Sequence, residues 1–185
     1  MLAILTAIIA AAAALLGAGL ASRAQLRAAR ETQAAQFHLE SLKIEAATDE
    51  KRRTEMLSNY AEAHKALSFI CREYSLTSLD IMENAKTSKF EYDKRYLESC
   101  ERLDSARATI EIYFNDAYSL TEEIYGEMNI FWGNFTEVTS LIEIDEPFEK
   151  YKNFHEKAVQ ASLRISALSV KCKTVIKAKA QQGIR

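Results

Sequence analysis

The chain has 185 residues, 48% of them hydrophobic, and a formal net charge of −2 at pH 7. This balance excludes bulk electrostatic attraction to nucleic acid, so no nucleic-acid partner is expected. Only five glycines and one proline are present, whereas folds built from strands and turns need such residues at their turns. The composition therefore predicts an all-α protein with long helices.

The first 21 residues contain no charged side chain. A helix rises about 1.5 Å per residue, so residues 1–21 span about 30 Å, the thickness of a bilayer's hydrocarbon core. We therefore expect a single transmembrane helix over 1–21. The alternative is a cleavable signal peptide, with Gly19-Leu20-Ala21 as its cleavage site. Such a peptide has a basic start and a shorter apolar core, and this chain has neither.

Three arginines, Arg23, Arg27 and Arg30, follow the apolar segment directly. Cytoplasmic flanks of membrane helices are enriched in Lys and Arg, so these residues are expected at the cytoplasmic membrane surface. The predicted location is the bacterial inner membrane, single-pass, with the N-terminus outside and the bulk of the chain cytoplasmic. The odd number and wide spacing of Cys71, Cys100 and Cys172 agree, because they indicate reduced thiols.

Small residues recur along the apolar segment with spacings of four and three. At about 100° per residue they fall within about 40° of one line down the helix. The residues predicted to mediate oligomerisation are Ala3, Ala7, Ala10, Ala14, Gly17 and Ala21. Such a line lets two membrane helices approach closely, which predicts a homo-oligomer. The alternative is a chance pattern in an alanine-rich segment.

Residues 22–47 are rich in Ala, Gln, Arg and Glu, which favour helix, and no breaker separates them from the apolar segment. We expect the membrane helix to continue as a helical stalk over 22–47. Its few apolar residues suit either a partly exposed helix or a coiled coil between protomers.

Residues 48–180 carry four amphipathic stripes, which predict a cytoplasmic four-helix up-down bundle. We expect helix ends within 75–88, a second helix over 89–117, and a third that opens with the capping pair Ser119 and Glu122. Asp145 is the expected N-cap of the last helix, with Pro147 in its first turn.

The side chains expected to face the core follow helical spacing. They are Met56, Tyr60, Ala63, Leu67, Ile70 and Tyr74; Leu97, Cys100, Leu103, Ala106, Ile110 and Tyr113; Leu120, Ile124, Met128, Phe131, Phe135 and Val138; and Phe148, Tyr151, His155, Ala158, Ser162, Ile165, Leu168, Cys172 and Val175. A basic tail over 181–185 ends the chain. The lysines before it either approach anionic lipid or form a solvated helix end.

No catalytic, cofactor-binding or metal site is expected, and the chain is predicted not to be an enzyme. The sequence lacks the second histidine of a zinc-protease motif after His155-Glu156, a glycine-rich phosphate loop and a G-x-S-x-G elbow. His155 is expected to be a core or interface residue. Phe131 and Trp132 are adjacent in a helix, so one of them is expected at an interface or a ligand groove.

In layout, with one N-terminal anchor followed by an all-helical domain, the chain resembles small CRISPR-associated and other phage-defence membrane accessory proteins of bacteria. The expected function is a non-enzymatic, self-associating membrane protein that presents its bundle to a protein partner as a scaffold. The alternative is an oligomeric, membrane-active effector that forms a pore or depolarises the membrane in antiviral defence. A third possibility is a sensor that binds a small ligand among its aromatic residues.

Overall fold

The computed structural model describes the backbone of residues 2–184 and the side chains of residues 6, 9, 10 and 12–182. The described backbone forms five α-helices and one short 3-10 turn, with no strand among the described residues. The all-α prediction is therefore confirmed. The long helices follow from the near absence of glycine and proline, since nothing before Ser75 interrupts the first helix.

The chain divides into two compact units, Met1–Arg52 and Arg53–Arg185. Helix α1 (Leu2–Glu73) forms the whole of the first unit and supplies one helix to the second. The boundary lies a few residues beyond residue 47, where the sequence predicted the end of the stalk. The two units are described separately below.

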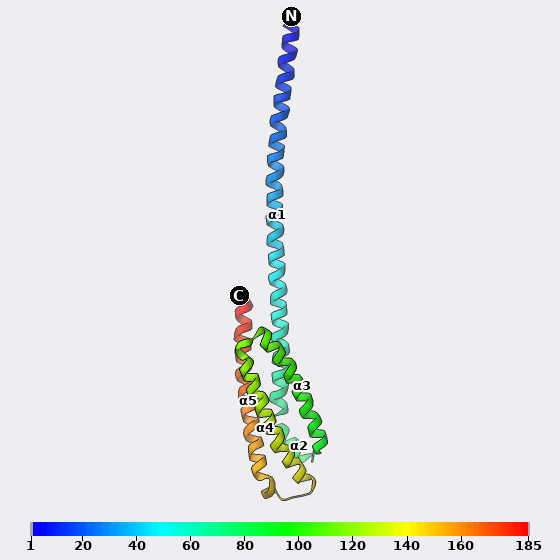
Figure 1. The fold of residues 1–185 in the computed structure, drawn as a ribbon, viewed down its shortest axis with the longest axis vertical. Helices are drawn as coiled ribbons and strands as arrows, with labels where there is room; N and C mark the ends of the chain where they lie inside the picture. The colour runs from blue at the N-terminus through cyan, green and yellow to red at the C-terminus, as the bar shows by residue number, and fades with distance from the viewer. Residues whose placement is uncertain (1, 185) are drawn as a thin grey trace. The chain divides into compact units, whose positions relative to one another are not determined.

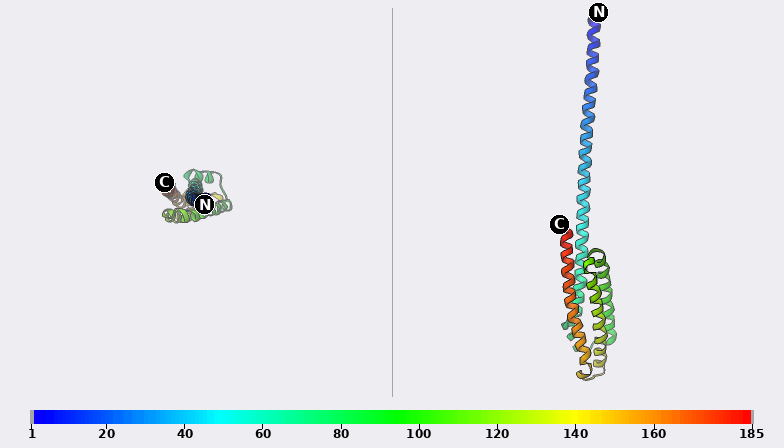
Figure 2. Two further views of the ribbon diagram at one scale, coloured as in Figure 1. Left: turned by 90° about the horizontal axis from the view of Figure 1, so that it is seen from above. Right: turned by 60° about the vertical axis from the view of Figure 1, so that its left-hand side comes forward.

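The second unit is a helical bundle (Figures 1 and 2). Its elements after α1 are α2 (Leu76–Asn84), α3 (Lys89–Tyr113), the 3-10 turn η1 (Asn115–Ala117), α4 (Tyr118–Glu143) and α5 (Phe148–Ile184). Helices α3 and α4 lie side by side, as do α4 and α5. The sequence predicted only helix ends between residues 75 and 88, but Ser75 caps a short additional helix there, α2, with its hydroxyl accepting from Ser78 N at 3.1 Å.

The core forms where the amphipathic stripes meet, and most of the predicted inward residues are buried. The α4 stripe is the most complete, since all six of its predicted members are buried. Two edge-to-face ring contacts join it to neighbouring segments. Tyr74, in the turn after α1, contacts Phe131 with centroids 5.1 Å apart, and Tyr92 of α3 contacts Phe135 with centroids 4.9 Å apart. Each buried large apolar side chain contributes about 1.5–3 kcal/mol, so these stripes supply most of the driving force for folding.

The predicted inward face of α3 was wrong at its start, because Leu97 is 66% exposed. The buried positions there are Tyr92 and Ser99, and they lead into Leu103 and Ala106. These four residues follow helical spacing, so the pattern was present in the sequence. The pattern was missed because one of its buried positions is a polar residue, Ser99. Ser99 is tolerated because its hydroxyl donates to the Arg95 carbonyl at 2.9 Å.

Helix α3 ends at Tyr113, earlier than the predicted end at residue 117. Phe114 leaves helical geometry (φ −137°, ψ 43°) and is fully buried. After η1, helix α4 begins at Tyr118, and no side chain caps it. The predicted capping pair at Ser119 was therefore wrong, because the helix has already begun when Ser119 is reached.

Asp145 does not cap α5 as predicted; it lies in the loop that follows α4, and this loop contacts the loop that follows α2. Lys86 (φ 48°) and Asp145 (φ 55°) both adopt the left-handed conformation that commonly terminates helices. Backbone bonds from Thr87 N to Met82 O and from Glu146 N to Leu141 O close these two helix ends, each at 3.0 Å. Lys86 Nζ donates to Asp145 Oδ1 at 2.7 Å. Asp145 thus ends α4 and is not the N-cap of α5. Pro147 lies just before α5, outside its first turn.

The glycines of α4 offer a direct test of this fold. Gly126 and Gly133 lie inside the helix at exposed positions, and a Cβ added at either meets nothing within 4 Å. We expect Gly126→Ala and Gly133→Ala each to raise the free energy of unfolding by up to about 1 kcal/mol, because alanine loses less backbone entropy in a helix. Urea unfolding of the full-length protein measures this. As a control, Ala108→Gly at an exposed position of α3 should lower the free energy of unfolding. A loss of stability in the α4 variants would contradict the placement of Gly126 and Gly133 at exposed positions inside a helix.

Candidate functional site

The predicted oligomerisation residues lie in the first unit, which is a single helix. Ala3 and Ala7 fall outside the residues whose side chains the structure describes. Ala10, Ala14, Gly17 and Ala21 are described, and all are exposed. A Cβ added at Gly17 meets nothing within 4 Å, and the same holds at Gly19 on the opposite side of the helix. This face is therefore open to a neighbouring molecule.

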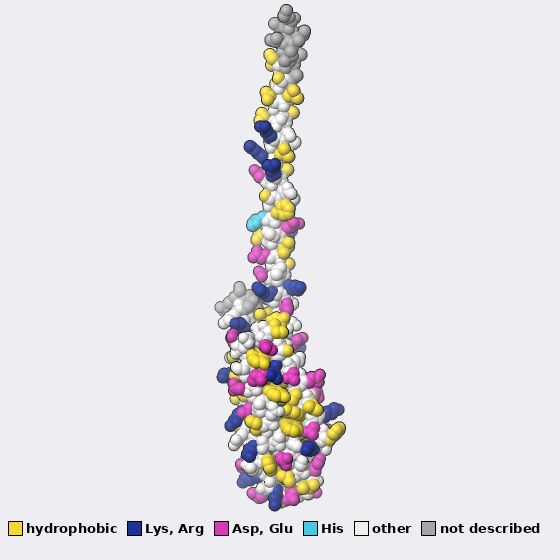
Figure 3. Space-filling model, in the orientation of Figure 1, with side chains coloured by type: hydrophobic (Ala, Val, Ile, Leu, Met, Phe, Trp, Pro, Cys, Tyr) yellow, Lys and Arg dark blue, Asp and Glu magenta, His cyan; other side chains and the backbone are white. Residues whose placement is uncertain are grey.

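The larger apolar side chains of this unit are exposed as well. Ile9, Leu15, Leu16, Leu20, Leu26, Phe37, Leu39, Leu42 and Ile44 have between 47% and 75% of their surface exposed. Figure 3 shows such hydrophobic side chains at the surface along this helix. Over the described residues, none of the helices is long and apolar enough to cross a membrane.

The three predicted membrane-surface arginines lie on one side of the same helix. Arg23, Arg27 and Arg30 are exposed, and with Leu26 they line an open hollow of about 240 Å³. No ion pair to these arginines occurs among the described residues. Three guanidinium groups spaced along one helical face can each meet an anionic group such as a lipid phosphate.

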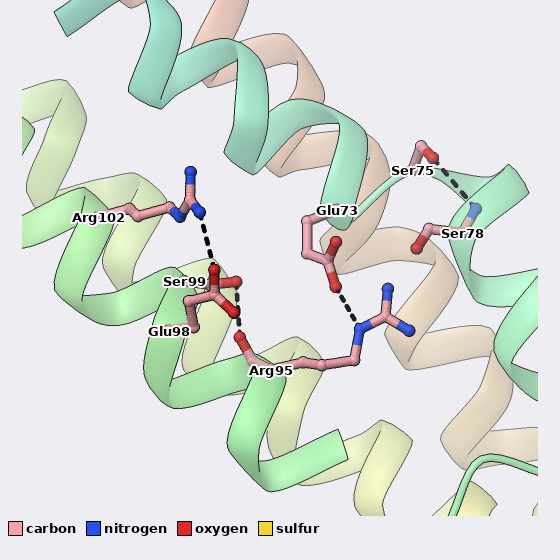
Figure 4. Close-up of polar contacts among 7 residues, drawn as sticks. All are labelled: Glu73, Ser75, Ser78, Arg95, Glu98, Ser99 and Arg102. Carbon is pink, nitrogen blue, oxygen red and sulfur yellow. Dashed lines mark hydrogen bonds and ion pairs between the residues drawn. The ribbon is translucent and has the colours of Figure 1, made fainter. Parts of the chain in front are cut away.

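In the second unit, a polar cluster joins α1 to α3 (Figure 4). Arg95 Nε donates to Glu73 Oε1 at 2.8 Å, and only 19% of the Glu73 side chain is exposed. Two turns further along α3, Arg102 Nη2 donates to Glu98 Oε1 at 2.8 Å. The guanidinium carbon of Arg102 lies 4.0 Å from the centroid of the Phe69 ring. Each charge in this cluster is already satisfied by a neighbour. The cluster therefore helps to hold α3 against α1.

A second polar contact joins α2 to α5. His155 Nε2 lies 3.1 Å from Glu83 Oε1, and about a fifth of each side chain is exposed. Glu83 Oε1 has no aligned hydrogen-bond partner among the described residues, so the contact is one of charge proximity. Burial raises the pKa of the Glu83 carboxyl, the nearby His155 lowers it, and the charge of Asp80 raises it. The ring of Phe148 packs edge-on against His155, with centroids 5.7 Å apart.

Phe131 and Trp132 face different ways, as their adjacent helix positions require, and the interface or ligand groove expected for one of them stays a prediction. Phe131 is fully buried, whereas Trp132 is half-buried, stacks on Tyr96 at 5.2 Å between centroids and donates to Asp93 Oδ1 at 2.8 Å. Tyr96 in turn donates to Asn129 Oδ1 at 2.5 Å. Sequence reasoning missed Tyr96, although its spacing from Tyr92 and Ser99 was the available signal.

The remaining candidate residues are not brought together. Among the described residues, no group of three His, Cys, Asp or Glu side chains is arranged to hold a metal ion. His38 lies exposed in the first unit and His64 packs beside the Tyr60 ring in the second, while the three cysteines are free thiols. Comparison of the chain with models of known families, with curated proteins and with solved structures found no match.

The Glu83 contact predicts a pH-dependent stability. A carboxyl whose pKa is raised by folding disfavours the folded state when it ionises, so stability is lost as the pH rises above its ordinary value of 4.5 and through the raised value. Glu83→Gln removes this charge. We expect the variant to be more stable than the natural chain at about pH 8, where the Glu83 carboxyl of the unfolded chain is ionised, and equally stable in acid.

Thermal unfolding followed by circular dichroism across the pH range measures this difference. Glu156→Gln, at an exposed position of α5, is the matched control and should show no such pH dependence. An equal stability difference for Glu83→Gln at every pH would show that burial of the Glu83 charge carries no cost.

Proposed function

We propose that this protein is a non-enzymatic, self-associating membrane protein, anchored by residues 1–21, that presents its helical bundle to a protein partner as an interaction scaffold. The observation that carries the proposal is the exposure of the first unit. A helix in water draws most of its stability from packing an apolar face. Every described large apolar side chain of residues 9–44 is instead at least 47% exposed.

Lipid and a second copy of the chain are the partners that we propose for this segment. Full burial of one leucine or isoleucine contributes about 1.5–3 kcal/mol, so covering these side chains would add several kcal/mol to the stability of the helix. Gly17 and its neighbours on the small-residue line suit a close helix–helix approach. The bulky Leu15, Leu16 and Leu20 suit the lipid tails.

For the second unit, we infer a four-helix up-down arrangement built from the end of α1, α3, α4 and α5, with α2 as an added short helix. The support is the side-by-side packing of α3, α4 and α5 and the short connections between them.

The proposed anchor also has an orientation. Its flank of Arg23, Arg27 and Arg30 marks the cytoplasmic side of the membrane, because cytoplasmic flanks are enriched in Lys and Arg.

The first test addresses self-association through the small-residue line. Gly17→Leu places a bulky side chain on the line and should lower the mass of the detergent-purified protein, measured by light scattering after size-exclusion chromatography. Gly19→Leu is the matched control on the opposite side of the helix and should leave the mass unchanged. Both positions have room within one chain, so folding is not at issue. An unchanged mass in both variants would refute association through this line.

The second test addresses the orientation. Replacing Arg23, Arg27 and Arg30 by Glu should expose the bundle to protease added outside spheroplasts, because the cationic flank that retains this side in the cytoplasm is lost. The matched Arg→Lys triple variant should stay protected. Recovery of the natural protein without detergent, or a mature N-terminus beginning after Ala21, would contradict the anchor.

A further inference from the structure

Acidic side chains predominate on α4 and basic side chains on α5. Helix α4 contains five glutamates and no lysine or arginine. The part of α5 from Lys157 to Ile184 contains no acidic residue. Its cations are Lys157, Arg164, Lys171, Lys173, Lys177 and Lys179. Two neighbouring helices of one bundle therefore carry opposite charge along most of their lengths.

Contacts within the chain leave most of these charges unpaired. Arg164 Nη1 lies 3.1 Å from Glu127 Oε1, and this is the one ion pair between α4 and α5 among the described residues. Glu123 and Glu137 on α4 are exposed, as are Lys171 and Lys177 on α5, and none of these four is in an ion pair within the part of the chain that the structure describes. The opposite charges thus point away from the bundle.

The two outer faces also differ in shape. On α5, Leu163 and Val170 are 55% and 54% exposed. They lie seven residues apart, on one side of the helix. On α4, Gly126 and Gly133 have the same spacing, and each has open space where a Cβ would stand. Seven residues rise about 10.5 Å, so the two projecting side chains on α5 have the same spacing as the two positions on α4 that carry no side chain.

We propose that the α5 face of one copy (Leu163, Val170, Lys171, Lys177) docks on the α4 face of a second copy (Glu123, Gly126, Gly133). With the two helices antiparallel, Leu163 lies over Gly133 and Val170 over Gly126. The Glu123 end of α4 then meets the lysine-rich end of α5. Charge complementarity selects this occupant: two α4 faces would oppose Glu to Glu, and two α5 faces would oppose Lys to Lys.

Because each copy offers one face of each kind, the contact is head-to-tail and generates a closed ring or an open chain. The inference deepens the self-association in the proposed function by adding a contact made by the bundle. It does not depend on the small-residue line of residues 1–21. The two contacts are therefore separable by experiment.

Charge exchange on the full-length protein tests the contact. Glu123→Lys makes its end of the α4 face basic, and Lys171→Glu with Lys177→Glu makes the facing end of α5 acidic. We expect each of these two variants alone to associate about tenfold or more weakly, and an equimolar mixture of the two to recover the natural affinity. Dilution of fluorescently labelled protein in detergent measures this affinity. Loss of association in each variant without recovery in the mixture would overturn the proposal.

Shape provides a second, independent measurement. Gly126→Leu with Gly133→Leu places a bulky side chain at each glycine of the α4 face. Leucine favours helix, so lost association cannot be assigned to unfolding. Ala108→Leu, at an exposed position of α3, is the matched control and should associate normally. Unchanged affinity in the α4 variant overturns the proposal. So does an α5 charge variant that associates normally but no longer binds vesicles of anionic lipid, since the α5 face would then serve lipid.

The Gly17→Leu and Gly19→Leu pair separates this contact from the proposed function. If Gly17→Leu lowers the mass and the charge variants do not, the bundle contact is wrong and the anchor contact stands. If the charge variants associate weakly and Gly17→Leu has no effect, the bundle contact stands and the small-residue line is wrong.

Discussion

The apolar stripe of α4 must be covered, and the arrangement of the second unit follows from that requirement. Ile124, Met128, Phe131, Phe135 and Val138 lie along one side of this helix and are completely buried. No single neighbouring helix can enclose a stripe of this width, so α1, α3 and α5 surround it. The edge-to-face contacts of Tyr74 and Tyr92 with its phenylalanines fix how the helices meet.

In the first unit, no other part of the chain covers the described apolar side chains, and the proposed function is based on this difference from the second unit. Its apolar side chains are exposed and its small residues face open space. Exposed apolar surface is typical of segments that contact lipid or another protein. In the bundle, by contrast, the apolar side chains of α4 are covered by neighbouring helices, and ion pairs such as Arg95–Glu73 and Arg164–Glu127 join helices to one another.

Helical periodicity predicted the long helices and most of the core, because apolar spacing decides which side of a helix is buried. It was wrong at Leu97, where a serine and a tyrosine occupy the buried positions and the leucine lies outside. Local signals were also wrong at Ser119 and Asp145. Phe114 leaves helical geometry and buries its ring, so α3 ends there and α4 begins only at Tyr118. Asp145 lies at the end of α4, in the left-handed conformation, and its carboxylate accepts a hydrogen bond from Lys86.

By itself, the sequence determined the all-α class, the uncharged N-terminal segment with its arginine flank, and the core stripes, because each depends on residues close together in the chain. Only the tertiary structure decided which charges stay unpaired. Glu83 meets His155 and Glu73 meets Arg95, whereas Glu123 and Lys177 lie exposed on the outer faces of the bundle. Pairing depends on which helix faces lie together, and that is set by packing between residues far apart in the sequence.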